Sequence, residues 1–356
     1  MKQKVFLTIA LLCAIAQGGW AGEILTYIDR TWDGDKKELK VQTGSTSDYV
    51  ELTSSDDWVE MNAATSEWYV VKGNVSIKVL KVTGNVKLLL CDDARLETTH
   101  VKLERGQIRL IDGDELHIYA QQDGSGQLIS TSTETGWAGI GGGSVGHGGM
   151  LHVHGGYVEA RAGKYAAGIG GGDNGYAGEY FQYGGEVKAY GGDYGAGIGT
   201  GDEPPFAYPC DIKIHGGTVW ASGGDGSGSE GSFWGMTDGG AGIGSGYAGD
   251  GCNICIDGGT IYAEGGKNAP GIGISRIHSY GYLNISGGNI TAKAGRDWQS
   301  SIRSYRPTIA NLMRVDAGSD ANNLTPAPSL GATKRWTVSH SLPYGPAQTT
   351  KCSLTS

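Results

Sequence analysis

Apolar and polar residues alternate in short runs on both sides of a Gly-Gly pair, and this 13-residue pattern occurs five times in the middle of the chain. In one copy, Ile212 and Ile214 precede the glycines, and Val219 and Ala221 follow them. Alternation with a period of two predicts half-buried β-strands. The glycines lie where the chain bends between strands, and glycine tolerates the positive φ that such a corner needs. The copies span 151–163, 180–192, 212–224, 254–266 and 283–295.

A second motif, Ala/Pro-Gly-Ile-Gly, links the copies and predicts a third short strand in each repeat. It begins at residues 138, 167, 196, 241 and 270, so the period is 29 residues except for one gap of 45. A fixed period in this range indicates a solenoid. Three short strands and three turns per period predict an all-β chain folded as a parallel β-helix. A calcium-binding β-roll is excluded because its Gly-rich nonapeptide does not recur.

The gap of 45 residues is one period plus an insertion of 16 residues around 225–239. Insertions in solenoids form loops, often on the binding face. This loop carries Asp225, Glu230, Trp234 and Asp238. It is therefore a candidate site for ligand contacts.

The first 21 residues have the pattern of a secretory signal peptide. Lys2 and Lys4 precede an apolar run over 5–16, and small residues continue to Ala21. The run is too short to span a bilayer, and we expect no transmembrane segment. Leu12 before Cys13 does not fit lipoprotein processing. The sequence predicts an exported protein, secreted or held at the cell surface.

The remaining chain divides by composition into three parts. Residues 22–74 lack the repeat and predict an N-terminal cap, since an open solenoid end exposes core and strand edges. Residues 75–305 form the expected β-helix, with irregular first rungs over 75–135 and Gly-rich repeats over 136–296. The proline-rich segment 306–356 predicts an irregular or disordered tail.

The net charge excludes some classes of binding partner, and the cysteine content indicates whether disulfides or metal sites are expected. A net charge of −9 argues against nucleic acid and anionic membranes. Five cysteines remain after the signal peptide, an odd number that makes a poor disulfide framework. Cys252 and Cys255 have the internal spacing of a zinc motif, but positions i and i+3 of a strand point to opposite faces. Structural cysteines are the better interpretation.

The repeat resembles Gly-rich repeats in secreted or surface proteins of gut bacteria, of the carbohydrate-binding-domain, right-handed β-helix type. The resemblance rests on I-x-I-x-G-G-T-[VI]-x-A-x-G-G followed by A-G-I-G-[GTS]-G, and it covers roughly residues 84–296. It implies a β-helix and favours carbohydrate binding. It supplies no catalytic motif, because this fold hosts lyases, hydrolases, adhesins and binders.

Outward residues of a β-helix form columns along the stack, about 4.8 Å apart. The strand after the Gly-Gly pair places aromatic rings from neighbouring rungs on one face, where sugar rings can stack. Aromatic rings on strands also pack against one another across rungs, which is the alternative explanation. The candidate ligand-binding residues are Glu159, Arg161, Tyr190, Trp220, Trp234 and Tyr262.

Two other sets of side chains suggest metal chemistry. Turn acids after the Gly-Ile-Gly strands offer the oxygen ligands that calcium prefers, although Asp is also an ordinary turn residue. These candidates are Asp173, Asp202, Glu203 and Asp250. His152, His154 and His215 share a strand region, but His215 lies about two rungs from His154. Exposed polar positions explain these histidines better than a shared metal ion.

The interpretation favoured by the sequence is a non-catalytic module that binds a polysaccharide. An alternative is a carbohydrate-active enzyme, a lyase or glycoside hydrolase, using Asp225, Glu230 and Asp238. The Gly-Ser surroundings of these acids are a poor platform for positioned carboxylates. A second alternative is a structural, adhesin-like surface repeat.

Overall fold

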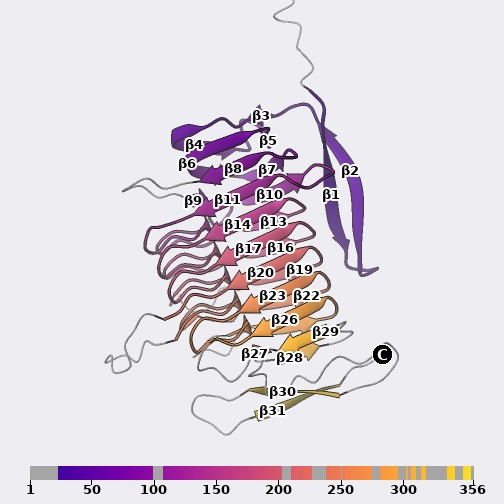
Figure 1. Cartoon of the computed structure of the whole chain (residues 1–356), viewed down its shortest axis with the longest axis vertical. Coiled ribbons are helices and arrows are strands. Elements are labelled where there is room, and N and C mark those ends of the chain that lie inside the picture. Colours follow the sequence, from indigo (N-terminus) through magenta and orange to yellow (C-terminus); the bar gives the residue numbers. More distant parts are fainter. Residues whose placement is uncertain are drawn as a thin grey trace, which may run out of the picture.

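The computed structural model confirms the predicted parallel β-helix. Its described residues consist of strands and turns, with parallel strands stacked rung upon rung along one axis (Figure 1). The described ranges are 23–98, 107–202, 210–226, 238–249, 251–274 and 281–295, with five short strands between 302 and 353.

Each repeat contributes three strands to the coil. In one rung these are β13 (Met150–Val153), β14 (Tyr157–Arg161) and β15 (Ile169–Gly170). Each strand pairs in parallel with its equivalent in the next rung. Between this rung and the next, residues 29 apart face each other, as Val158 and Val187 do. The following rungs are β16 (Glu179–Gln182), β17 (Glu186–Tyr190), β18 (Ile198–Gly199); β19 (Asp211–Ile214), β20 (Thr218–Ser222), β21 (Ile243–Gly244); β22 (Asn253–Ile256), β23 (Thr260–Glu264), β24 (Ile272–Gly273); and β25 (Tyr282–Ile285), β26 (Asn289–Lys293), β27 (Ile302–Arg303).

The less regular segment before the repeats already follows the same stacking. Strand β10 (Glu115–Ala120) pairs in parallel with β7 (Asn85–Leu90) on one side and with β13 on the other. The remaining early strands are β6 (Asn74–Thr83), β8 (Arg95–Thr98), β9 (Gln107–Arg109), β11 (Gln127–Thr131) and β12 (Ile140–Gly141).

The inward residues of successive rungs form buried columns, which are the core. Every isoleucine of the Gly-Ile-Gly strands is at most 3% exposed. The column also extends beyond the sequence motif in both directions, because Ile108 pairs with Ile140 and Ile302 pairs with Ile272. Burying such side chains stabilises a fold by about 1.5–3 kcal/mol each. The members of this isoleucine column are Ile108, Ile140, Ile169, Ile198, Ile243, Ile272 and Ile302.

Glycine is required at the corner that follows the isoleucine of each Gly-Ile-Gly strand. Gly170 has a φ of +129°, and a Cβ built there would lie 2.1 Å from the carbonyl oxygen of Gly199 in the next rung. No side chain fits against backbone at that distance. The second glycine of the Gly-Gly pair also has positive φ, +81° at Gly156, as the sequence predicted.

The coil continues in register across the 16-residue insertion. Ile198 pairs directly with Ile243 although 45 residues separate them. The extra residues therefore add no rung to the coil. Most of it, residues 227–237 with Glu230 and Trp234, lies outside the described residues.

A disulfide joins the rung that contains this insertion to the next rung. Cys210 and Cys252 precede β19 and β22, and their Cα atoms are 4.5 Å apart. The odd cysteine count suggested no disulfide framework, but rung stacking places these two residues opposite each other. Cys255 lies on β22 outside this bond.

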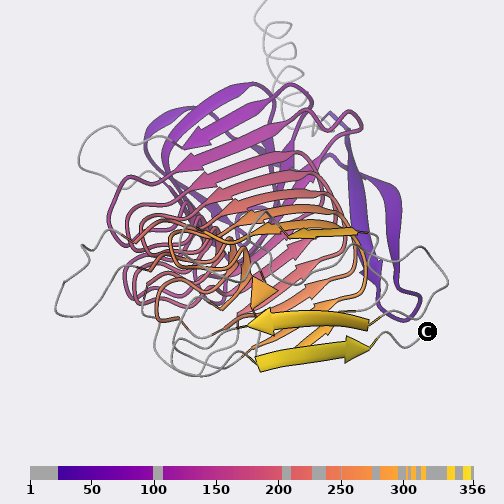
Figure 2. The ribbon, with the colours of Figure 1, turned by 60° about the horizontal axis from the view of Figure 1, so that its bottom comes forward.

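The N-terminal segment 22–74 does not act as a single cap. Strands β1 (Leu25–Asp33) and β2 (Glu38–Thr46) form an antiparallel hairpin that runs along the side of the coil rather than over its end (Figures 1 and 2). The following strands, β3 (Val50–Glu51), β4 (Ser55–Asn62) and β5 (Trp68–Val71), join the stacked sheets in parallel. The first rung therefore starts near Val50.

The stacking also continues past residue 305, where the sequence suggested an irregular tail. Strand β28 (Arg306–Ile309) pairs with β25, and β29 (Arg314–Ala317) pairs with β26. Strands β30 (Arg335–His340) and β31 (Gln348–Ser353) then form an antiparallel pair near this end (Figure 2). Backbone pairing to an open rung edge does not require the Gly-rich motif, which is why composition missed it.

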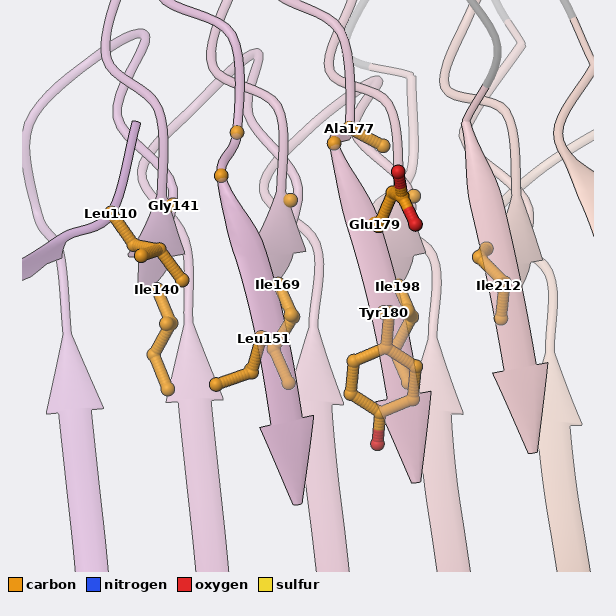
Figure 3. Close-up of a pocket in the computed structure, with 15 residues that line it drawn as sticks. Leu110, Ile140, Gly141, Leu151, Ile169, Ala177, Glu179, Tyr180, Ile198 and Ile212 are labelled. Carbon is orange, nitrogen blue, oxygen red and sulfur yellow. The ribbon is translucent and has the colours of Figure 1, made fainter. Parts of the chain in front are cut away.

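A narrow internal gap lies at one corner of the coil, between the Gly-Ile-Gly strands and the neighbouring sheet (Figure 3). Its walls are largely apolar, including Ile140, Leu151, Ile169 and Ile198, with Tyr180 projecting into it. These residues belong to the core. The gap is a packing feature rather than a ligand site.

Replacing Gly170 by alanine is expected to lower the free energy of unfolding by about 3 kcal/mol or more, because the variant combines backbone strain with overlap against Gly199. Urea denaturation measures the change. Gly34→Ala is the matched control, since nothing lies within 4 Å of a Cβ built there, and it should change stability by less than about 0.5 kcal/mol. Equal effects of the two substitutions would contradict the corner constraint.

Removing the disulfide with Cys210→Ala and Cys252→Ala is expected to lower the free energy of unfolding by about 4 kcal/mol, from the entropy of a closed loop with a 42-residue separation. Reductant should destabilise the wild-type protein by a similar amount and leave the double variant unchanged. Cys255→Ala is the control. A wild-type protein insensitive to reductant would show that this bond does not form.

Candidate functional site

The coil has two extended outer faces, and the β1–β2 hairpin covers part of one of them. The open face is formed by β14, β17, β20, β23 and β26, which follow the Gly-Gly corners. On it, the register places Glu159, Lys188, Trp220, Tyr262 and Thr291 in one column. A second column contains Arg161, Tyr190, Ser222, Glu264 and Lys293.

Trp220 and Tyr262 stack directly on each other across two rungs. Their ring centroids are 3.8 Å apart and the planes differ by 11°. Each ring therefore covers one face of the other, and the pair presents edges to solvent with Trp220 41% exposed. Tyr190 lies in the neighbouring column, so the three predicted rings do not form one flat row.

The polar candidates Glu159 and Arg161 are organised by their neighbours. Arg161 Nε donates a hydrogen bond to Glu159 Oε1 at 2.8 Å, and its guanidinium lies 3.9 Å from the Tyr190 ring centroid. Tyr157 Oη donates to the other oxygen of Glu159 at 2.5 Å. Burial raises the pKa of Glu159, but these hydrogen bonds outweigh it and the pKa is lowered. The carboxylate is thus charged and held in place at the surface.

The acids proposed for an enzyme hold neighbouring backbone and side chains instead. Asp225 Oδ1 accepts a hydrogen bond from Lys267 N at 2.6 Å. Asp238 is 4% exposed and accepts from Asn268 Nδ2 at 2.8 Å. Both carboxylates therefore fasten the turn of the next rung, at 267–268. Glu230 and Trp234 lie outside the described residues.

The calcium candidates are also engaged in turns. Asp173 Oδ1 accepts from Asn174 Nδ2 at 2.8 Å, and burial raises its pKa. Asp202 is 9% exposed. Within the described ranges, neither belongs to a group of three His, Cys, Asp or Glu whose ligand atoms lie within 4.8 Å of one another. Glu203 and Asp250 fall outside those ranges.

The hairpin side carries two columns of stacked rings. Tyr119, His154, Tyr183 and His215 form one, with centroid separations of 4.1, 5.0 and 5.6 Å. His117, His152 and Phe181 form the other, at 4.3 and 4.5 Å.

Strand β1 covers the first of these columns. Tyr27 packs on Tyr119, and Trp32 stacks on His215 at 4.6 Å. Five residues of extended strand cover about 17 Å, comparable with the three rung steps from Tyr119 to His215, about 14 Å. The hairpin therefore runs along the coil axis.

The histidines are consequently buried, not exposed as the sequence suggested. His154 is 3% exposed and His152 is 9% exposed. For His154 the expectation failed because strand β1, distant in sequence, covers its column. His152 lies in the other column, stacked between His117 and Phe181. The separation of His215 from His154 is as expected, since Tyr183 lies between them.

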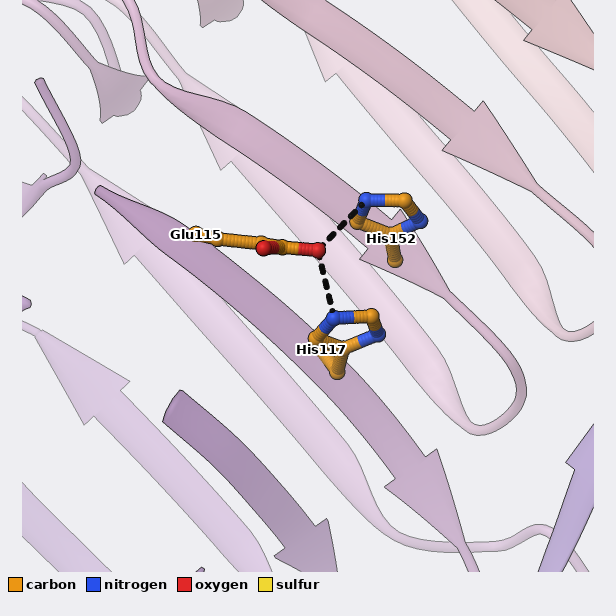
Figure 4. Close-up of side chains that lie close together, drawn as sticks. All are labelled: Glu115, His117 and His152. Atoms are coloured by element: carbon orange, nitrogen blue, oxygen red, sulfur yellow. Dashed lines mark hydrogen bonds and ion pairs between the residues drawn. The ribbon is translucent and has the colours of Figure 1, made fainter. Parts of the chain in front are cut away.

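Glu115, His117, His152 and His154 form a connected cluster at the edge of the hairpin, and Figure 4 shows the first three of them. Glu115 Oε1 is 2.8 Å from His117 Nε2 and 3.2 Å from His152 Nε2. His117 Nδ1 is 3.0 Å from His154 Nε2, and His154 Nδ1 is 2.8 Å from the carbonyl oxygen of Arg30 in β1. The cluster links β10, β13 and the hairpin.

Burial keeps these imidazoles neutral near pH 7. Burial, followed by the charge of His117, lowers the pKa of His152 to about 3 and that of His154 to about 4. Burial also lowers the pKa of His117, against the opposing effect of Glu115. Neutral imidazoles have a ring nitrogen with a free lone pair, which is the form that binds metals.

Sequence reasoning missed Glu115 and His117 because they precede the recognisable repeats. One signal was present: Leu116 and Ile118 have the same alternation as Leu151 and Val153. Aligning these two pairs places His117 beside His152, as the strand register does.

A family model described as a β-helix repeat matches residues 151–173, 183–202, 212–232, 254–273 and 283–302. The matched segments coincide with the Gly-rich rungs, so this part of the chain consists of β-helix repeats. No curated protein and no solved structure gave a significant match. In the described residues, no helix is long and apolar enough to cross a membrane.

Lowering the pH is expected to destabilise the metal-free protein through His154. Its pKa is lowered to about 4 in the fold, against about 6.5 when unfolded, so the unfolded chain binds the proton more readily. The stabilisation is complete above about pH 6.5 and is lost as the pH falls towards 4, by on the order of 3 kcal/mol.

Urea denaturation across this pH range, with a chelator present, measures the loss. His154→Asn keeps an amide donor near the position of Nδ1 but removes the titrating ring. Its stability should depend less steeply on pH than that of the wild type. Parallel pH profiles would refute the role of His154.

Proposed function

We propose that the protein is a non-catalytic module that binds an extended polysaccharide on its open face. The observation that carries the proposal is the half-exposed Trp220–Tyr262 pair, set in register beside columns of charged and hydroxyl side chains. Aromatic rings contact the apolar faces of sugars, and the polar neighbours supply hydrogen bonds to hydroxyl groups. The columns run along the coil, a geometry suited to a long linear ligand.

Two features of the open face support recognition by a rigid surface. Glu159 is fixed by Tyr157 and Arg161, so it loses little conformational entropy on binding. Strands hold functional side chains more firmly than loops do. The stacked pair presents its ring edges to solvent, so the ligand lies across the column rather than between Trp220 and Tyr262.

The arrangement of acids favours binding over catalysis. Glycoside hydrolysis requires two carboxyl groups facing one substrate position. Asp225 and Asp238 each engage a residue of the neighbouring turn, Lys267 and Asn268. We propose that these acids stabilise the loop base.

Export is part of the proposal. The Cys210–Cys252 disulfide joins adjacent rungs, and such bonds persist in oxidising compartments. This supports the signal-peptide interpretation of residues 1–21 and a location outside the cell or at its surface. The negative charge of the chain favours neutral or basic glycans.

Trp220→Ala combined with Tyr262→Ala is expected to weaken polysaccharide binding by about tenfold or more, since stacked aromatic contacts contribute about 0.5–1.5 kcal/mol each. A glycan array identifies the ligand, and titration calorimetry measures the affinity. Trp58→Ala is the matched control because Trp58 is 44% exposed on the first rung, in β4. If the double variant binds the glycan as tightly as the wild type does, the open face is not the binding site. If the protein cleaves the glycan, it is an enzyme and not a non-catalytic binding module.

A further inference from the structure

The geometry points to a divalent metal site of the zinc type formed by Glu115, His117 and His152, at the edge of the β1–β2 hairpin. Among the described residues, this is the sole set of three potential ligand side chains whose donor atoms lie within 4.8 Å of one another (Figure 4). Two imidazoles, one carboxylate and a water molecule make a common tetrahedral zinc site. Nothing in the glycan-binding proposal depends on it.

The hydrogen-bond chain determines which nitrogen faces the site. The carbonyl oxygen of Arg30 can only accept, so His154 Nδ1 carries the proton. In a neutral ring, His154 Nε2 then accepts, and His117 Nδ1 must be its donor. A neutral His117 therefore directs the lone pair of Nε2 at Glu115 Oε1, 2.8 Å away.

Two lone pairs facing each other at this distance repel unless a cation lies between them. A proton between the two atoms would relieve this repulsion, but it would serve only this one pair of atoms. His152 Nε2 adds a third donor atom, a buried nitrogen with no hydrogen-bond partner, 3.2 Å from the same oxygen. A bound metal ion satisfies all three atoms together.

The distances also suit a metal ion. Ligand bonds of about 2.0–2.1 Å in a tetrahedral site separate the ligand atoms by about 3.3 Å, close to the observed 2.8 and 3.2 Å. The imidazole planes of His117 and His152 are now 13° apart. Coordination of one ion requires both rings to tilt towards Glu115, whose side chain is 25% exposed and leaves a path for water.

The neighbours of His117 are arranged like those of metal-binding histidines in general. A ligating histidine donates its other N–H to a neighbouring acceptor, which fixes the ring. Here His117 Nδ1 donates to His154, and His154 is in turn anchored on Arg30 of the hairpin. The metal would therefore join β10 to β13 and tighten the attachment of β1.

The test uses the full chain, purified without a histidine tag and stripped with a chelator. Zn²⁺ is titrated in competition with a chromophoric chelator, and Co²⁺ is added separately because its visible spectrum reports tetrahedral nitrogen and oxygen ligands. We expect one Zn²⁺ per chain. Glu115→Gln and His152→Phe should each weaken binding at least 100-fold and abolish the tetrahedral Co²⁺ spectrum.

The two variants keep the test independent of folding. Gln is isosteric with Glu, and His152→Phe matches Phe181, which occupies the same column one rung on. His147→Ala, in the loop before β13, is the control and should bind like the wild type. Wild-type affinity in both site variants, or no tetrahedral Co²⁺ spectrum in the wild type, would overturn the site.

Discussion

The close approach of each rung to the next is the constraint on which the rest of the structure depends. Peptide groups of equivalent strands bond directly, as Ile169 N does to Gly197 O and Gly171 N to Gly199 O, both at 3.0 Å. At this spacing the corners have no room for a Cβ, which explains why the repeats keep glycine there. Equivalent side chains are then forced into columns, both inside and outside the coil.

With stacked repeats alone, both outer faces of the coil would be exposed to solvent. The β1–β2 hairpin covers part of one face and leaves the other exposed. Its strand β1 buries the column of Tyr119, His154 and His215, whereas the column of Trp220 and Tyr262 stays open. The same covering strand lowers the polarity around the histidines and so shifts their pKa values. The position of β1 therefore explains both why the Trp220–Tyr262 column is exposed and why the histidines on the other face are buried and neutral.

The β-helix could be predicted from the sequence because each repeat contains the same short motifs at a regular spacing. Val158, Val187 and Val219 face inward as the alternation predicted, and the insertion after β20 leaves the register intact. Contacts between segments that are distant in the sequence could not be predicted in this way. Nothing in the sequence near Arg30 indicates that it meets His154, 124 residues away, and the pairing of Cys210 with Cys252 appears only once the rungs are stacked.

Strand β1 contacts several rungs at fixed positions along its length. The spacing of these contacts along β1 must therefore match the spacing of the rungs along the coil axis. Tyr27 packs on Tyr119 in β10. Arg30 binds the carbonyl oxygen of His154 directly after β13, and Trp32 stacks on His215 directly after β19. A gain or loss of one 29-residue repeat between them would leave the core unchanged in kind, yet it would move Trp32 by about 4.8 Å relative to His215. Repeat number in this part of the molecule is therefore constrained by the length of a strand outside the repeats, while rungs beyond β19 are free of that restriction.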